Sequence, residues 1–125
     1  MNIVDSSGWL EYFSGTKRSG LFSEAIEKTD KLIVPTISLY EVFKKIYLER
    51  DENSALRAIA HMQQGTVIDL DASISIFAAK LSRDRKIPMA DSIILATARK
   101  YKATLWTQDE DFIGLDRVKY FPKKQ

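Results

Sequence analysis

The fold class can be read from one stretch, Leu32-Ile33-Val34-Pro35-Thr36-Ile37-Ser38-Leu39-Tyr40-Glu41. Its first residues form an unbroken apolar run, which predicts a buried strand over residues 32–35. Pro35 closes this strand, because proline has no N–H to donate to a neighbouring strand. Apolar residues then recur at helical spacing, which predicts an amphipathic helix over residues 37–50. A buried strand that leads directly into an amphipathic helix is the unit from which α/β folds are built.

The same alternation runs along the rest of the chain. Further strands are predicted over residues 2–5, 66–69, 104–107 and 117–121. Further helices are predicted over residues 6–13, 21–28, 53–62, 72–83 and 90–101. The strands show almost no alternation of polar and apolar residues, which indicates a parallel sheet covered by helices on both faces. We therefore expect an α/β fold, a three-layer α/β/α sandwich with a central parallel sheet of about five strands. The order of the strands does not follow from these residues.

Length and composition narrow the class of protein. The chain has 125 residues, of which 45% are hydrophobic and 29% charged, and its formal net charge is +2. These values are typical of one globular domain, which we expect to span residues 1–125. The absence of cysteine excludes disulfides, zinc–thiolate sites and cysteine nucleophiles. The sequence shows no signal-peptide pattern and no apolar run long enough to cross a membrane, so we expect a cytoplasmic protein.

Acidic residues stand where the predicted topology would gather them. Asp5 ends the first predicted strand, and Asp109 follows the strand that ends at Thr107. Side chains at the carboxyl ends of parallel strands meet at one edge of the sheet, where ligands bind. Three more acidic residues stand near helix starts or in the next turn: Glu41, Asp91 and Asp111. Carboxylates brought together repel one another unless a cation neutralises them, so the sequence predicts a divalent metal site in an enzyme.

Several of these residues also have a plain structural explanation. Asp5 could cap the helix predicted over residues 6–13. Glu41 stands three positions after Ser38, which matches a capping box, in which a glutamate reaches back to the first residue of the helix. Asp109 and Asp111 lie in a turn, where aspartate is common. Each residue taken alone therefore leaves two interpretations open.

Asp91 favours the functional interpretation more strongly. It lies in the first turn of a predicted helix, where negative charge is favourable. It also shares a helical face with Ile94, Leu95 and Ala98, and that face must pack inward. No lysine or arginine lies within one turn of Asp91, and a partly buried carboxylate needs a partner.

Four segments together resemble the motifs of PIN domains, and they occur in that family's order. They are Met1-Asn2-Ile3-Val4-Asp5-Ser6-Ser7, Ile37-Ser38-Leu39-Tyr40-Glu41, Ile87-Pro88-Met89-Ala90-Asp91-Ser92-Ile93-Ile94-Leu95-Ala96-Thr97-Ala98 and Leu105-Trp106-Thr107-Gln108-Asp109-Glu110-Asp111-Phe112. The resemblance covers nearly the whole chain and implies a central five-stranded parallel sheet and a magnesium- or manganese-dependent ribonuclease. A stand-alone PIN domain of this length is similar to the toxins of type II toxin–antitoxin pairs, the VapC group.

The resemblance also implies roles for individual residues. The family's catalytic acidic positions correspond to Asp5, Glu41, Asp91 and Asp109. We expect Asp5, Asp91 and Asp109 to bind Mg²⁺ or Mn²⁺. Glu41 would be a ligand of a second metal or would orient the attacking water. Asp111 matches a more variable fifth acid and is an accessory candidate, as are Ser6 and Thr107, either of which could hydrogen-bond a ligand carboxylate.

Expectations about partners follow from the same resemblance. It implies an RNA substrate, a cognate antitoxin protein and a homodimer. The basic run Arg83, Arg85 and Lys86 could hold the RNA backbone by charge, although such runs are also common on solvated surfaces. Tyr40, Phe43 and Tyr47 exceed what one core face of the helix over residues 37–50 needs. We expect the antitoxin to lay an apolar segment there and to send an arginine toward the carboxylates.

Two other classes of protein share some of these features. A receiver-type phosphoacceptor domain would need a second acid beside Asp5 and a lysine after its last strand. Ser6 and Ser7 follow Asp5 instead, and no lysine fits. The other alternative is a PIN-fold RNA-processing nuclease or RNA-binding module outside any toxin–antitoxin system. Metal titration and the identity of the neighbouring gene would separate these alternatives.

Overall fold

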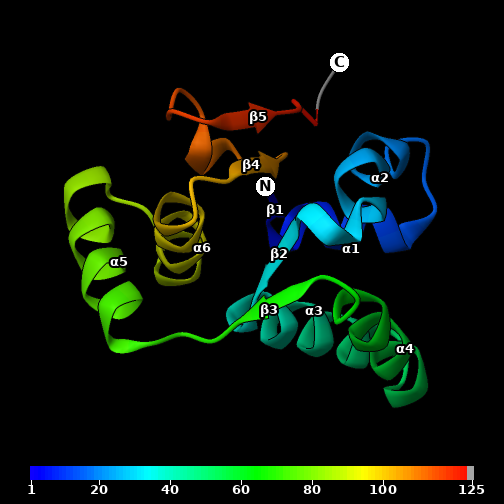
Figure 1. The fold of residues 1–125 in the computed structure, drawn as a ribbon. Coiled ribbons are helices and arrows are strands. Elements are labelled where there is room, and N and C mark those ends of the chain that lie inside the picture. Colours follow the sequence, from blue (N-terminus) through cyan, green and yellow to red (C-terminus); the bar gives the residue numbers. More distant parts are fainter. Residues whose placement is uncertain (124–125) are drawn as a thin grey trace.

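The computed structural model describes residues 1–123, and Figure 1 shows how the elements are arranged. The strands are β1 (Asn2–Val4), β2 (Leu32–Pro35), β3 (Thr66–Ile68), β4 (Thr104–Thr107) and β5 (Val118–Tyr120). The helices are α1 (Ser6–Ser14), α2 (Gly20–Glu27), α3 (Thr36–Glu49), α4 (Glu52–Met62), α5 (Ala72–Arg85) and α6 (Met89–Lys100). Two short 3-10 helices are η1 (Thr29–Lys31) and η2 (Glu110–Phe112). Each predicted strand and helix is present, with ends that differ from the prediction by at most two residues.

All five strands form one parallel sheet in the order β3-β2-β1-β4-β5. The central strand is β1, whose Ile3 lies opposite Ile33 of β2 and Leu105 of β4. From β1 the chain adds β2 and then β3 on one side. It then crosses back and places β4 on the other side of β1. The direction of winding therefore reverses between β1 and β4, which makes this pair the topological switch point of the sheet.

Two hydrophobic clusters fill the two faces of the sheet. One contains Ile3 and Leu105 together with buried residues of α5 and α6. The other contains their chain neighbours Val4 and Trp106 together with buried residues of α1 to α4. Successive residues of a strand point to opposite faces, and here both faces are covered, which is why the strands read as unbroken apolar runs. Figure 1 shows α5 and α6 on one side of the sheet, and the predicted three-layer α/β/α sandwich is confirmed.

Aspartate side chains cap the starts of three helices, α1, α4 and α5. Asp5, Asp51 and Asp71 each accept a hydrogen bond from the backbone N–H three residues later, at the first turns of α1, α4 and α5. Helix α6 begins after Pro88 and is buried continuously from Ser92 to Ala98. Among residues 1–123, none of the helices is both long enough and apolar enough to cross a membrane.

Candidate metal centre

The switch point between β1 and β4 brings two of the predicted site residues together. Asp5 follows β1 directly, and its backbone N–H donates to the Trp106 carbonyl of β4 at 3.2 Å. Asp109 comes two residues after the end of β4. The two strands are adjacent and parallel, so their carboxyl ends present these side chains at the same edge. This edge is where ligands bind in open parallel sheets.

Asp5 is the most deeply buried acidic residue of the site, with 1% of its surface exposed. Its carboxylate accepts hydrogen bonds from the Thr107 hydroxyl at 2.6 Å, the Ser7 hydroxyl at 2.9 Å and the Gly8 backbone N–H at 2.9 Å. The last of these bonds caps α1, so Asp5 is the helix cap that the sequence allowed. Burial raises the pKa of Asp5 to about 6, although all three hydrogen bonds oppose the rise. Thr107 therefore fixes the position of the Asp5 carboxylate.

Three further carboxylates lie close together beside Asp5. Oxygen atoms of Asp91, Asp109 and Asp111 all lie within 4.8 Å of one another. Asp91 is half-buried in the first turn of α6, above a helical face whose residues are buried. The pKa of Asp91 is raised to about 8, mainly by burial and in addition by the charge of Asp109, a hydrogen bond with Asp111 and the charge of Asp5. In the absence of a cation, the protein therefore disfavours the ionised form of Asp91.

The turn after β4 arranges the other two carboxylates of this group. The Asp109 backbone N–H donates to the Thr107 hydroxyl at 2.8 Å. One carboxylate oxygen of Asp109 accepts from the Asp111 backbone N–H at 2.9 Å, at the start of η2. The turn interpretation of Asp109 thus holds, and the same turn also aims Asp111 at Asp91. Sequence reasoning treated Asp111 as an accessory, whereas the structure places it in the cluster itself.

Glu41 lies on α3 and does not form the capping box. Helix α3 begins at Thr36, so Ser38 is already inside the helix, and no side chain among residues 1–123 caps its first turn. The Glu41 carboxylate instead accepts a hydrogen bond from the Ser6 hydroxyl at 2.6 Å. Because Ser6 is the residue after Asp5, this bond ties Glu41 to the carboxyl end of β1. The capping interpretation is therefore wrong, and Ser6 contacts Glu41.

A polar network that the sequence did not indicate holds the end of β4. Gln108 stands between Thr107 and Asp109 and is only 5% exposed. Its carbonyl oxygen accepts two hydrogen bonds from the Arg18 guanidinium, at 2.9 and 3.1 Å. Its amide nitrogen donates to Glu11 of α1 at 2.9 Å. Nothing in the local sequence links positions 11, 18 and 108, so only the tertiary structure could identify this network.

The donor set fits a divalent cation of the magnesium class. Asp91, Asp109 and Asp111 offer only carboxylate oxygens, the hard ligands that such ions prefer. Burial is the largest cause of the raised pKa values of Asp5 and Asp91, and repulsion by neighbouring carboxylates adds to the rise at both residues. A bound cation would relieve that repulsion.

An open hollow of about 510 Å³ lies next to the cluster. Asp109 and Asp111 line it together with Ser7, and Tyr120 and Lys123 also line it. The Asp109 and Asp111 carboxylates are therefore reachable by a ligand much larger than an ion.

Comparison with known proteins agrees with the fold. The family model described as the PIN domain matches residues 3–118, so the chain belongs to the PIN domain family. PIN domains are typically metal-dependent nucleases. No curated protein matches the chain significantly at the level of sequence.

Solved structures with similar folds include toxins of VapBC pairs. A toxin–antitoxin complex from Klebsiella pneumoniae superposes with a TM-score of 0.81 at 23% identity, over 95% of this chain and 96% of that one. The VapC20 toxin of Mycobacterium tuberculosis, described as cleaving the sarcin–ricin loop, has a TM-score of 0.72 at 17% identity, over 90% and 92%. DNA-bound VapBC from Salmonella typhimurium has a TM-score of 0.72 at 14% identity, over 97% and 98%. At these identities the likeness is one of fold over the full chain.

Proposed function

We propose that residues 1–125 act as a metal-dependent endoribonuclease, the toxin of a toxin–antitoxin pair in the cytoplasm. The observation that carries the proposal is the group formed by Asp91, Asp109 and Asp111, whose oxygens lie within 4.8 Å of one another at the switch point of a PIN domain. The similarity to VapC toxins supports RNA as the substrate class.

Each residue has a definite part in this proposal. Asp5, Asp91 and Asp109 hold Mg²⁺ or Mn²⁺, with Asp111 as an additional carboxylate. When bound, such an ion lowers the pKa of a water and offsets charge on the reacting phosphate. Thr107 keeps the Asp5 carboxylate in place through its 2.6 Å hydrogen bond. Glu41, held by Ser6, orients the attacking water or binds a second ion.

The first experiment measures cleavage of single-stranded RNA by the purified protein. Wild-type protein should cleave with Mg²⁺ or Mn²⁺ and stop with EDTA. Asp91→Asn keeps the size of the side chain but removes the charge that binds the ion, so the rate should fall roughly a thousandfold or more. The matched control is Asp30→Asn, an exposed aspartate before β2, which should cleave like wild type. Undiminished, EDTA-sensitive cleavage by Asp91→Asn would overturn the proposed metal site.

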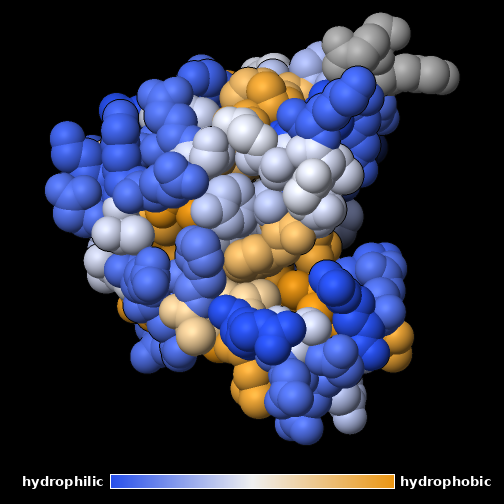
Figure 2. Space-filling view, turned by 90° about the vertical axis from the view of Figure 1, so that its right-hand side faces the viewer, coloured by the Kyte–Doolittle hydropathy of each residue, from blue (hydrophilic) through white to orange (hydrophobic). Residues whose placement is uncertain are grey.

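An exposed apolar surface on α3 and α4 supports the proposed antitoxin. Tyr40 and Tyr47 are 60% and 55% exposed, and with Phe43 and Ile59 they line a hollow of about 530 Å³. Aromatic side chains exposed to this degree are typical anchors for an amphipathic partner segment. Figure 2 shows the side of the molecule that carries α2 and α4, which is mostly hydrophilic with hydrophobic residues near its top, in its middle and in its lower part. We propose that an apolar segment of the antitoxin occupies the Tyr40–Tyr47 hollow, and that the toxin is a homodimer.

The second experiment tests the biological role and the partner. Expression of the chain alone should arrest growth, Asp5→Asn should abolish the arrest, and the product of the adjacent gene should relieve it. Tyr40→Ala with Tyr47→Ala should weaken that relief without changing cleavage by the isolated protein. Harmless wild-type expression would contradict the toxin assignment and favour a PIN-fold RNA-processing nuclease, even if cleavage survives. Light scattering of the purified chain measures whether it is a dimer.

A further inference from the structure

A second hollow, separate from the acidic cluster, lies between α6 and the segment that leads into β5. Its volume is about 400 Å³, and it shares no residue with the group of Asp91, Asp109 and Asp111. Leu95 and Leu105 form part of its apolar floor. Charged residues from three parts of the chain form its rim: Arg85, Arg99, Lys102, Asp116 and Arg117. Two basic runs that are separate in the sequence, around residues 85 and 99, therefore converge on one pocket.

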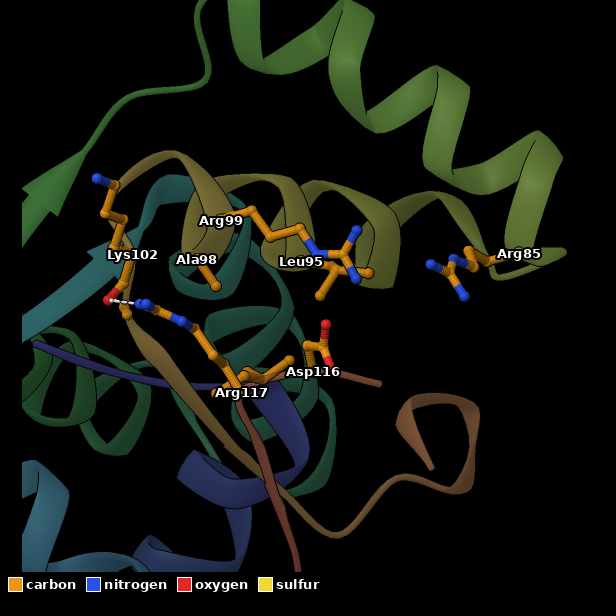
Figure 3. Close-up of a pocket in the computed structure, with 9 residues that line it drawn as sticks. Arg85, Leu95, Ala98, Arg99, Lys102, Asp116 and Arg117 are labelled. Carbon is orange, nitrogen blue, oxygen red and sulfur yellow. Dashed lines mark hydrogen bonds between the residues drawn. The ribbon is translucent and has the colours of Figure 1, made fainter. Parts of the chain in front are cut away.

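Figure 3 shows which of these charges face the hollow. The guanidinium groups of Arg99 and Arg85 and the carboxylate of Asp116 point toward it. Arg117 points away and donates a hydrogen bond to the Lys102 carbonyl at 2.7 Å. The Lys102 side chain also extends away from the hollow. The groups available to a ligand are thus two guanidiniums from different helices and one carboxylate.

Neither guanidinium has a partner within residues 1–123. Arg85 and Arg99 form no ion pair and donate no side-chain hydrogen bond there, and Arg99 is only half-exposed. By contrast, the Arg18 guanidinium near the acidic cluster contacts Gln108, Glu11 and the Phe121 carbonyl. A guanidinium presents its donors as a planar fork that matches two oxygens of a phosphate. Two guanidiniums beside the apolar side chains of Leu95 and Leu105 can bind a phosphate group together with the sugar attached to it.

We infer that this pocket binds a backbone phosphate of the RNA strand at a point beside the scissile bond, without reading its sequence. The inference rests on the proposed ribonuclease function. The segment from Asp109 to Arg117 supports it, because its start belongs to the acidic cluster and its end to the pocket. Along α6, Asp91 and Arg99 are separated by a rise of roughly 12 Å, a span that a short single strand can cover.

The competing explanation is that Arg99 and Asp116 simply neutralise each other across the hollow. The two explanations predict opposite effects for Asp116→Asn. If the pocket binds phosphate, removal of the carboxylate removes a repulsive charge, and RNA should bind more tightly. If the acid serves only to hold Arg99, the same change should leave RNA binding as it is.

The experiment measures binding of a fluorescent single-stranded RNA in EDTA, so that no cleavage occurs. Affinity is titrated at several salt concentrations for wild type, Arg85→Gln, Arg99→Gln and Asp116→Asn. The matched control is Arg57→Gln, an exposed arginine on α4 on the other side of the molecule, which makes the same change in net charge. Thermal melting checks that each variant is folded.

Loss of one phosphate contact should lower the slope of log affinity against log salt by about 0.7 for single-stranded RNA. Arg85→Gln and Arg99→Gln should each show this and bind severalfold more weakly for all sequences tested, whereas Arg57→Gln should bind like wild type. Equal behaviour of Arg99→Gln and Arg57→Gln would overturn the inference. If those two variants behave alike but the protein still cleaves RNA, the pocket inference fails and the proposed function stands. If RNA binds through the pocket but is not cleaved, the proposed function fails and the pocket inference stands.

Discussion

At the scale of single residues, the same carboxylate can serve the fold and the site. Asp5 caps α1 through Gly8 and is at the same time buried beside Asp109 and Asp91. Structural and functional interpretations of an aspartate at a strand end are therefore not exclusive. Burial is what distinguishes Asp5 from the caps of α4 and α5, because Asp51 and Asp71 are exposed and their pKa values are lowered by the backbone N–H groups that they accept from.

Glu41 is the residue whose function can be separated most cleanly from its structural contact. Glu41→Gln keeps an oxygen that accepts from the Ser6 hydroxyl but removes the negative charge. We expect RNA cleavage to fall at least tenfold, about 1.4 kcal/mol of transition-state stabilisation. The melting temperature should stay within about a degree of wild type, since a part-exposed hydrogen bond is conserved. Full activity of the Glu41→Gln variant would mean that Glu41 has only a structural role.

At the scale of elements, the first turn of α1 positions the site through close packing. A Cβ placed on Gly8 would lie 2.6 Å from Val4 Cγ1 and 2.8 Å from a ring carbon of Phe22. Both neighbours are fully buried, so neither can move aside easily. Glycine at this position lets the helix approach β1 closely enough for the Gly8 N–H to reach the Asp5 carboxylate.

We therefore expect Gly8→Ala to cost about 1–3 kcal/mol of unfolding free energy, by overpacking. Cleavage by the folded fraction should fall as well, because the clash moves the turn that holds Asp5. Gly20→Ala at the start of α2 is the control, since its added methyl group meets no atom of the described part of the chain within 4 Å. Urea unfolding of both variants measures the difference. Equal stability of the two would contradict the packing argument.

The position of helix α3 follows from local sequence, but the contact of its Glu41 does not. Its amphipathic pattern predicted its position within one residue at each end. The capping-box interpretation of Glu41 was wrong, because the pattern Ser38-x-x-Glu41 is a capping box only if the helix starts at Ser38. Pro35 sets the start earlier, at Thr36, and the partner of Glu41 lies 35 positions away in sequence. A contact of that range leaves no local pattern.

At the scale of the whole molecule, the acidic cluster links stability to pH and to metal. The pKa of Asp91 rises from 3.8 to about 8 on folding, and that of Asp5 to about 6. Between pH 3.8 and about pH 8, the folded protein thus binds more protons than the unfolded chain. The stabilising contribution of the protonated carboxyls is complete below pH 3.8 and is lost as the pH rises toward about 8.

Without metal, we expect these two carboxyls to lower the melting temperature progressively as the pH rises from about 4 to about 8. Mg²⁺ should raise it at the upper end of this range, because the ion binds only the ionised carboxylates. Asp91→Asn should flatten the metal-free pH profile and remove most of the response to Mg²⁺. Melting curves at matched ionic strength measure both effects. A wild-type profile unaffected by Mg²⁺ at pH 8 would contradict a metal centre at this site.

The sequence by itself determined what depends on neighbours along the chain. Apolar runs and helical spacing specify strands and helices within a few residues, and unbroken apolar strands specify a sheet covered on both faces. The placement of Asp5 and Asp109 after strands was enough to predict an acidic edge, since parallel strands end at a common edge.

Only the tertiary structure decided how those pieces meet. The order β3-β2-β1-β4-β5 makes β1 and β4 neighbours, and that adjacency sets Asp5 beside Asp109. The packing of the other elements also brings Asp111 to Asp91, joins Arg18 to Gln108, and places Arg85 and Arg99 around one pocket. These pairs come from separate elements, and their contacts arise from the packing of two hydrophobic clusters against the sheet. Packing of that kind is a property of the assembled core, so no local pattern in the chain encodes it.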